Sequence, residues 1–330
     1  MRRFCWAGDG RSDCGLNREE YLAFQKERIA KVTLIMEEIY GGLPGIFTAE
    51  EFPKFLSFFA RWNHYPALNV VLLYMRCPHA TYLAGFQRWK ELALEQGRSE
   101  KYPILKVEQR KNGIPLLIPF SLSDLERGRI AKRYLEYHSV LVFDVSQVHS
   151  ILTPPVFSPF VDLRSYGFRE FCLILRYRLQ NQVSILPGVP HRYFRLGGAY
   201  IEGNKIFYNG ALGDQEKAEG ILEQVIRFHG ERLYGKDASF PLILYAATYM
   251  VFSFFQFPVE SFRFEPVAEL QKEPPEVLLH LLSAAGEIMK KCIFEVYMGH
   301  QAFLRDFVHP EEDQFLRQLE ERLYEEYNKE

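Results

Sequence analysis

With 330 residues, the chain is long enough to form two domains or one large one. Hydrophobic residues make up 48% and charged residues 25%, a composition that excludes intrinsic disorder and indicates an ordinary packed core. The formal net charge of −2 hides an asymmetry: residues 1–150 carry 21 Lys and Arg against 17 Asp and Glu, whereas residues 151–330 carry 19 against 25. The positive surplus of the first half is compatible with a nucleic-acid partner, although it is small for a segment of this length.

The five cysteines stand far apart, and their odd number indicates neither a disulfide framework nor paired metal-binding motifs. We therefore expect a reducing, cytoplasmic location. The basic N-terminus turns polar before any apolar run forms, so we expect no signal peptide. The most apolar stretch, residues 240–257, is interpreted as a buried helix rather than a membrane span.

Two helices are predicted near the N-terminus. Asn17 caps a helix to about Tyr40, which the glycines and proline of residues 41–45 are expected to end. Thr48 and Glu51 form the pattern of a capping box, which predicts a second helix to about Phe59.

Residues 61–92 predict a helical hairpin. Pro66 suits the first turn of a helix, and Pro78 disfavours helical backbone at Cys77, so the first helix should end there. Thr81 is expected to cap the second helix, which carries Phe86 and Trp89 on one face.

The pattern changes to short β-prone runs after residue 97. Residues 104–107 and 114–120 flank an Asn112-Gly113 pair, which predicts that a tight turn joins them in a hairpin. Residues 139–143 predict a further strand. A basic run at residues 127–133 is assigned to a helix. The first half is therefore predicted to be α+β, with a helical hairpin followed by a small antiparallel sheet.

Several short motifs resemble one known family. They are Tyr65-Pro66-Ala67-Leu68-Asn69, Pro78-His79-Ala80-Thr81, Ala84-Gly85-Phe86 with Trp89, and Asp144-Val145-Ser146-Gln147. In this order they resemble the N-terminal domain of ArdC-type antirestriction proteins, although Pro66 replaces the usual serine and the expected glycine- and lysine-rich turn is reduced at residues 97–101. The resemblance implies binding of single-stranded DNA during conjugative transfer, with proteins of the conjugation or restriction machinery as further partners.

The candidate DNA contacts combine aromatic and basic side chains, since bases stack on rings and phosphates attract cations. Trp89 has a second interpretation as a core anchor, and Asn69 is either a base reader or a buried cap for a neighbouring turn. The full candidate set is Arg61, Trp62, His64, Tyr65, Asn69, Arg88, Trp89 and Lys90.

The second half is predicted to be a separate, mostly helical domain. Three prolines mark residues 151–165 as a linker, which gives domains at residues 1–150 and 166–330. A hairpin is predicted at Tyr200–Asn209 around Gly203-Asn204, followed by helices at about residues 215–234, 239–257 and 275–298. A charged, exposed helix is predicted at residues 310–327.

This order of elements resembles the metallopeptidase-like domain of ArdC- and LtrC-like proteins, whose first helix carries an H-E-x-x-H motif that binds zinc. Alignment on Ile206–Asn209 and Leu212 places Glu223, Gln224 and Arg227 at the motif. No zinc-binding histidine stands there, and Gln224 lacks the carboxylate of a general base. We therefore expect no metal, no cofactor and no enzymatic activity.

The leading hypothesis is a non-catalytic, single-stranded-DNA-binding protein of a mobile element, related to antirestriction or conjugation and without a membrane partner. The alternative is a protein-interaction module that keeps the fold but binds neither DNA nor metal. The third hypothesis for the function is an active peptidase.

Overall fold

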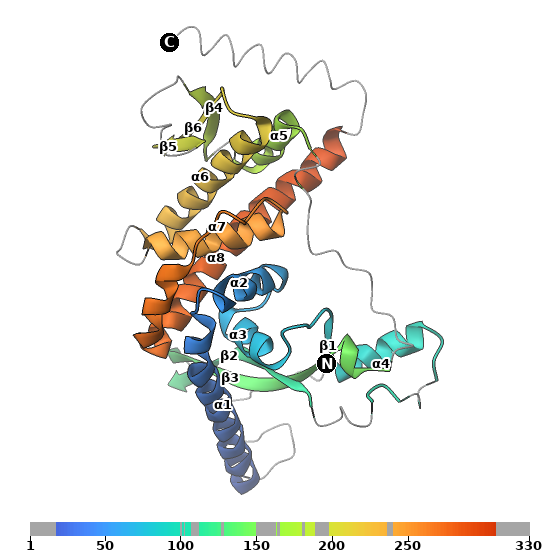
Figure 1. The fold of residues 1–330 in the computed structure, drawn as a ribbon. Helices are drawn as coiled ribbons and strands as arrows, with labels where there is room; N and C mark the ends of the chain where they lie inside the picture. The colour runs from blue at the N-terminus through green and yellow to red at the C-terminus, as the bar shows by residue number, and fades with distance from the viewer. Residues whose placement is uncertain are drawn as a thin grey trace. The chain divides into compact units, whose positions relative to one another are not determined.

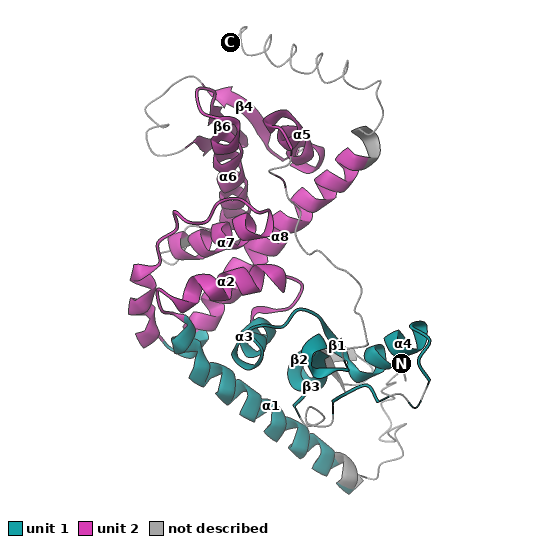
Figure 2. Cartoon of the chain, turned by 45° about the vertical axis from the view of Figure 1, so that its right-hand side comes forward, with its two compact units in different colours: residues 1–46, 68–157, 274–276 teal, residues 47–67, 158–273, 277–330 magenta. Residues whose placement is uncertain are grey.

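The structure is a computed structural model that describes residues 18–99, 101, 103–106, 112–126, 129–149, 163, 166–179, 182–188, 198–235 and 240–307. It divides into two compact units, drawn in teal and magenta in Figure 2. Unit 1 comprises residues 1–46, 68–157 and 274–276, and unit 2 comprises residues 47–67, 158–273 and 277–330. Most of the proline-rich segment and the predicted helix at residues 310–327 lie outside the described residues.

Unit 1 combines helices with a small sheet, labelled in Figure 1. Strands β1, β3 and β2 lie in that order and pair antiparallel throughout. The predicted α+β class, with a small antiparallel sheet in the first half, is confirmed. The elements in chain order are α1 (Arg18–Ile46), α3 (Ala67–Arg76), β1 (Leu83–Gly85), α4 (Phe86–Glu95), β2 (Ile114–Glu126), β3 (Arg129–Asp144) and the 3-10 turn η2 (Val145–Gln147).

Helix α1 does not end at the glycines of residues 41–45 but continues to Ile46, so the predicted end was wrong. Gly42 lies against α3, where a Cβ atom would come within 2.1 Å of Met75 Cε. The same pair of helices is joined by the Arg76–Glu38 ion pair. The glycine thus permits a close helix contact, and this packing outweighs the low helix propensity of glycine.

The second helix of the predicted hairpin begins later than expected, because Thr81 does not cap it. The carboxylate of Asp144 accepts hydrogen bonds from the amides of Thr81 (2.9 Å) and Tyr82 (3.2 Å) and holds this segment extended. Strand β1 follows and pairs with the end of β3, from Leu83 opposite Asp144 to Gly85 opposite Val142. Helix α4 starts only at Phe86.

Strand pairing also differs from the prediction. The Asn112-Gly113 pair does not join the two expected strands, because β2 pairs with β3 along residues 114–126 and 129–144. Leu105 instead forms an isolated antiparallel bridge with Val148. The basic run assigned to a helix falls partly on β3, so that assignment was wrong: once residues 114–126 pair with 129–144, the second segment must be extended.

Asn69 on α3 covers the outer edge of the sheet. Its Nδ2 donates to the carbonyl of Leu117 (2.9 Å), and its Oδ1 accepts from the amide of the same residue (2.8 Å). Strand β2 lies at the edge of the sheet, so among the described strands these two backbone groups have no neighbour on that side. Asn69 is 4% exposed and takes the place of a strand at this position.

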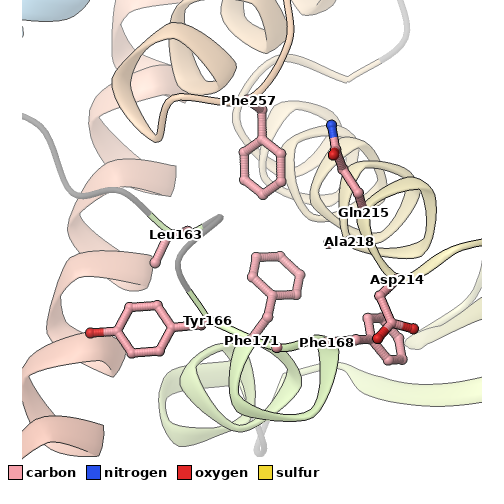
Figure 3. Close-up of a pocket in the computed structure, with 9 residues that line it drawn as sticks. Leu163, Tyr166, Phe168, Phe171, Asp214, Gln215, Ala218 and Phe257 are labelled. Atoms are coloured by element: carbon pink, nitrogen blue, oxygen red, sulfur yellow. The ribbon is translucent and has the colours of Figure 1, made fainter.

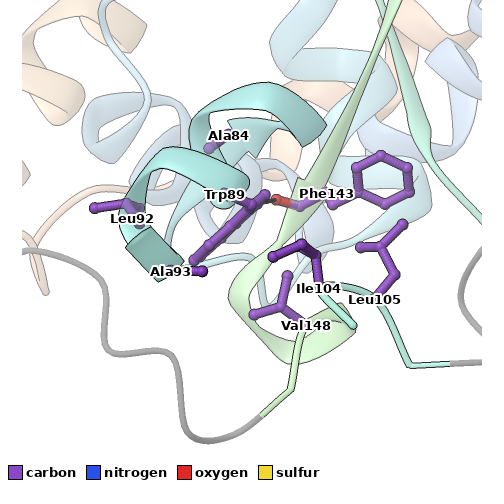
Figure 4. Packing of buried hydrophobic residues seen from close by; sticks show 8 residues of the cluster. All are labelled: Ala84, Trp89, Leu92, Ala93, Ile104, Leu105, Phe143 and Val148. Carbon is purple, nitrogen blue, oxygen red and sulfur yellow. Dashed lines mark hydrogen bonds between the residues drawn. The ribbon is translucent and has the colours of Figure 1, made fainter. Parts of the chain in front are cut away.

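Trp89 anchors α4 to the sheet (Figure 4). Its side chain is fully buried, and its indole N–H donates to the carbonyl of Phe143 on β3 at 3.0 Å. The surrounding cluster comprises Ala84, Leu92, Ala93, Ile104, Leu105, Phe143 and Val148. The core of this part of unit 1 therefore lies between α4 and the bridge that joins Leu105 to Val148.

Unit 2 is mostly helical and has a three-stranded sheet of order β4-β6-β5. The predicted hairpin is confirmed: β5 and β6 pair antiparallel, with Gly203 at positive φ in the turn. Helix α5 and strand β4, which pairs parallel to β6, were not predicted. The elements are α2 (Glu51–Arg61), α5 (Phe168–Leu179), β4 (Ser184–Gly188), β5 (Ala199–Glu202), β6 (Lys205–Asn209), α6 (Asp214–Tyr234), α7 (Phe240–Phe254), η5 (Glu265–Lys272) and α8 (Pro275–Phe307).

Replacing Asn69 with leucine should lower the free energy of unfolding of unit 1 by about 2 to 4 kcal/mol, because both backbone groups of Leu117 would remain buried without partners. Asn63→Ala provides the matched control. Asn63 is half-buried and makes one hydrogen bond, to the carbonyl of Ala60, so its loss should cost less than about 1 kcal/mol. Urea unfolding followed by circular dichroism measures both changes, and equal losses would contradict the structural role of Asn69.

Candidate functional site

The predicted DNA contacts are divided between the two compact units. One group lies at the end of α2 and in the turn that follows it, and the other lies on α3 and α4. The groups are Arg61, Trp62, His64 and Tyr65 in unit 2, and Asn69, Arg88, Trp89 and Lys90 in unit 1.

The turn after α2 brings three aromatic rings together, which we call the aromatic ledge: Trp62, His64 and Tyr65. The ring centroids of His64 and Tyr65 lie 4.3 Å apart, and that of Trp62 lies 5.8 Å from His64 and 5.9 Å from Tyr65. The amide of Tyr65 donates to the carbonyl of Trp62, which closes the turn. Trp62 is buried, Tyr65 is half-buried and His64 is exposed, so the ledge presents an imidazole and part of a phenol to solvent.

Lys290 of α8 supports the ledge from another part of the sequence. Its Nζ donates to the carbonyl of Tyr65 at 2.7 Å. Burial lowers the pKa of Lys290, although Glu287 opposes that effect. Partial desolvation of the His64 ring, assisted by the positive charge of Lys290, also lowers the pKa of His64 below its ordinary value. This shift favours the neutral form of the ring, and a neutral ring can stack on a base.

Two of the candidates in unit 1 face inward. Both polar atoms of the Asn69 side chain are bonded to Leu117, which leaves no amide edge to read a base. Trp89 is fully buried with its N–H bonded to Phe143, so its ring faces the core and not the solvent. The structure thus places Trp89 as the core anchor that the sequence left as an alternative, and Asn69 as a buried partner of β2.

Helix α4 nevertheless has an exposed face. Phe86, the first residue of the helix, is 50% exposed, and Lys90 lies one turn further along the same side. Arg88 points elsewhere on the helix and forms ion pairs with Glu91 (3.3 Å) and Glu95 (2.8 Å). Its charge is therefore compensated within α4, whereas Lys90 has no carboxylate partner among the residues that the structure describes.

The positions aligned with the metallopeptidase motif lie on α6 and do not fit a zinc site. Glu223 and Arg227 are exposed, Gln224 is half-buried, and Arg227 lies 3.9 Å from Glu231. Zinc sites are built from His, Cys and carboxylate ligands, and one carboxylate at Glu223 is far short of that requirement. Within the described part of the chain, no group of three such residues is placed to hold a metal ion.

His229 on α6 is buried, and its Nε2 has no hydrogen-bond partner among the described residues. Its pKa is lowered to about 4, mainly by burial. The positive charges of Lys291 and Arg232 contribute to this lowering, whereas Glu295 acts in the opposite direction. The imidazole is therefore neutral at pH 7 and behaves as a packing residue that resists protonation.

A pocket of about 210 Å³ lies between α5 and the start of α6 (Figure 3). Its walls are mostly aromatic, and the rings of Phe171 and Phe257 meet edge to face at 6.0 Å. Asp214 is the one charged residue among its described lining residues, and its carboxylate accepts from Lys217 Nζ at 3.2 Å. The pocket thus combines apolar walls with a carboxylate that already has a cation, and it contains no pairing of a nucleophile with a base. The lining residues are Leu163, Tyr166, Gly167, Phe168, Phe171, Asp214, Gln215, Ala218 and Phe257.

Sequence reasoning did not find the contribution of Lys290, because it lies 225 residues from Tyr65 and no local pattern marks it. The sequence places Phe86 and Trp89 on one face of the helix, and the structure separates them, because Trp89 is fully buried whereas Phe86 is 50% exposed. Among the described helices, none is both long and apolar enough to cross a membrane.

His229 predicts an acid dependence of stability. Its pKa is lower in the folded than in the unfolded state, so its contribution to stability is fully present above pH 6.5 and is lost as the pH falls towards 4. The lost free energy is about 3 kcal/mol. His229→Gln should remove this part of the pH dependence, whereas His280→Gln, at an exposed histidine of α8, should leave it unchanged. Urea unfolding between pH 4 and 7 measures this, and a H229Q profile parallel to that of the wild type would contradict the assignment.

Comparisons with known proteins were made for the whole chain. No protein-family model matches the sequence, and no curated protein matches it. Among solved structures, the chain is similar to the metal-free antirestriction protein ArdC from plasmid R388, with 12% sequence identity and a TM-score of 0.44 over 71% of this chain and 86% of that chain. The Mn(II)-bound structure of the same protein gives 13% identity and a TM-score of 0.42, over 70% and 89%. Both of these structures are of the antirestriction protein ArdC.

Proposed function

We propose that this protein binds single-stranded DNA without catalysing a reaction, and that it acts in antirestriction during the transfer of a mobile element. The observation that carries the DNA proposal is the aromatic ledge, in which an exposed neutral imidazole lies against a half-buried phenol ring. The antirestriction part rests on the motifs from Tyr65 to Gln147 that resemble the ArdC family. Proteins of the restriction or conjugation machinery are further proposed partners.

The ledge has the features that sequence-tolerant binding of a single strand requires. Each base has a π face, and stacking on an aromatic side chain needs no hydrogen-bond readout. His64 offers an exposed ring for such a contact, and Tyr65 extends the surface by 4.3 Å between centroids. Trp62 lies behind them, buried, and fixes the turn that presents both rings.

Cations lie next to these rings. Arg61 is in the last turn of α2, directly before Trp62, and Lys290 contacts the backbone of Tyr65. A phosphate that follows a base stacked on His64 would lie within reach of such side chains, and its neutralisation releases counterions. On unit 1, Phe86 and Lys90 form a second pair of an aromatic ring and a cation, one helical turn apart.

Residue types support the non-catalytic part of the proposal. The aligned motif has no histidine in residues 223–227, and Gln224 cannot accept a proton as a carboxylate would. The nearest histidine on α6, His229, is buried and has a pKa lowered to about 4. Peptide hydrolysis would need a positioned base and an activated nucleophile, and α6 provides neither at these positions.

Titration of a fluorescein-labelled oligothymidylate with the full-length protein at low salt tests the proposal by fluorescence anisotropy. His64→Ala should weaken binding roughly five- to 150-fold, since stacking contributes about 1 to 3 kcal/mol per base. Because His64 is exposed, this variant should remain folded. His79→Ala is the matched control. His79 is also exposed, but it lies in the turn after α3, where no aromatic ring of the described residues contacts it.

The salt dependence separates two arginines. Arg61→Ala should reduce the slope of log Kd against log salt by about 0.7 if Arg61 contacts one phosphate. Arg88→Ala should change it less, because Arg88 is already paired with two glutamates. If the folded wild-type protein shows no salt-sensitive binding of the single strand, the DNA proposal fails and the non-catalytic interaction module takes its place.

A further inference from the structure

The pocket between α5 and the start of α6 is apolar at its base and polar at its mouth (Figure 3). Its base consists of buried apolar side chains: Leu163, Phe171, Ala218 and Phe257. Two aromatic rings, Tyr166 and Phe168, are half-buried, and the exposed lining residues are Gly167, Asp214 and Gln215. Proteins bind small organic molecules in pockets of this kind, with apolar walls and a few polar groups.

The volume of the pocket, about 210 Å³, is sufficient for a small organic molecule, since an apolar cavity of about 150 Å³ holds benzene. Both half-buried rings are fixed from outside the pocket. The hydroxyl of Tyr166 is hydrogen-bonded to His300 Nε2 of α8 at 2.6 Å, and the Phe168 ring meets that of Tyr208 edge to face at 5.1 Å. Rings that are already fixed lose little conformational entropy when a ligand binds.

The chain itself shows that a cation is accepted beside this pocket. Lys217 Nζ lies 5.2 Å from the centre of the Phe168 ring and 3.2 Å from Asp214 Oδ1. The face of an aromatic ring attracts a positive charge, and the attraction is stronger where water is excluded. The side chain of Asp214 is 69% exposed, and its second oxygen, Oδ2, accepts no hydrogen bond from the described residues. This oxygen is therefore available to a second cation.

Three carboxylates lie near the mouth of the pocket, and Lys217 compensates one of them. Besides Asp214, the carboxylate of Glu170 lies over Gly167, where a Cβ atom would come within 2.5 Å of Glu170 Oε2. Glu216 accepts a hydrogen bond from the amide of Gly213 at 3.0 Å and so occupies the N-terminus of α6. The mouth therefore repels an anionic ligand and attracts a cationic one.

We propose that this pocket binds a small organic cation with a quaternary ammonium head, which lies against the rings of Tyr166 and Phe168 beside Asp214 Oδ2. A quaternary ammonium has no N–H to donate, so aromatic faces and a nearby carboxylate are sufficient to hold it. A primary ammonium would lose hydrogen bonds with water that the apolar base cannot replace. The pocket contains no residue of the aromatic ledge, so this inference does not depend on DNA binding.

Choline and 3,3-dimethylbutan-1-ol test whether the charge is needed, because they share one shape and differ only in the central atom of the head. Both carry three equivalent methyl groups, so saturation-transfer NMR titrations with the full-length protein measure them in the same way. Choline should bind with a Kd below about 10 mM and at least about fivefold more tightly than the alcohol. Absence of choline binding, or equal binding of the two compounds, would overturn the proposal.

A first pair of variants tests the aromatic wall. Phe168→Leu removes the ring but keeps an apolar side chain. It should weaken choline binding about two- to 30-fold and leave binding of the alcohol within about twofold. Phe294→Leu, at an exposed ring of α8 that does not line the pocket, should change neither. Equal effects of the two substitutions on choline would place its binding elsewhere.

A second pair tests the carboxylate and uses exposed side chains, so it remains informative if Phe168→Leu fails to fold. Asp214→Asn should weaken choline binding at least about threefold. Glu216→Gln removes the same charge from the same turn of α6 but lies outside the lining of the pocket, so it should change choline binding less than about 1.5-fold. Choline binding that Asp214→Asn leaves unchanged would contradict the site.

Nα-acetyl-trimethyllysine methylamide carries the same head on a lysine side chain and separates a free small molecule from a methylated protein as the source of the ligand. Binding of this compound that equals or is weaker than that of choline supports a free small molecule. Binding at least about tenfold tighter than that of choline would overturn that assignment.

Discussion

The carboxylate of Asp144 is the contact on which the arrangement of unit 1 depends. It accepts hydrogen bonds from the amides of Thr81, Tyr82 and Ser146, while the amide of Asp144 donates to Gln147 Oε1. A charged acceptor gives stronger hydrogen bonds than a neutral one, and here it joins the end of β3 to a segment more than sixty residues earlier. Strand β1, the start of α4 and the burial of Trp89 against Phe143 follow from this connection. Of the motif residues, Asp144, Asn69 and Trp89 therefore build the scaffold, whereas Tyr65 and Phe86 reach the surface.

A scaffold of this kind explains how a small set of exposed side chains can act as a binding surface. Asn69 and Trp89 use their polar atoms on backbone groups of β2 and β3 and so hold α3 and α4 against the sheet. Phe86 and Lys90 are then left on the outer side of α4. In unit 2, the buried Trp62 plays the corresponding part for His64 and Tyr65. In both places, a ring is held by packing behind it, which reduces the entropy lost when a ligand binds.

Helix α6 packs closely against its sheet just before the positions that the sequence resemblance aligns with a metal-binding motif. Gly220 lies against Gly198 at the start of β5, where a Cβ atom would come within 2.8 Å of the Gly198 carbonyl carbon. This contact, together with the burial of Val225 and Ile226, holds the helix on its sheet. The residue types at positions 223 and 227 do not affect this packing, because Glu223 and Arg227 face solvent. Fold and chemistry are therefore separable in this unit.

The sequence by itself determined the elements whose signals are local. These include α3 between two prolines, the β5–β6 hairpin around Gly203 and the α+β class of the first half, because turn residues and apolar periodicity act over a few positions.

Only the tertiary structure decided the rest. The partner of β2, the extended backbone at Thr81 and the continuation of α1 through Gly42 depend on Asp144, β3 and Met75, which lie far away in sequence. The same holds for the candidate site. Residue types identified its aromatic and basic members, but burial separated exposed His64 and Phe86 from buried Asn69 and Trp89. A contact between residues 225 positions apart added Lys290. Such choices are made by packing and hydrogen bonding between distant segments, and no local pattern records them.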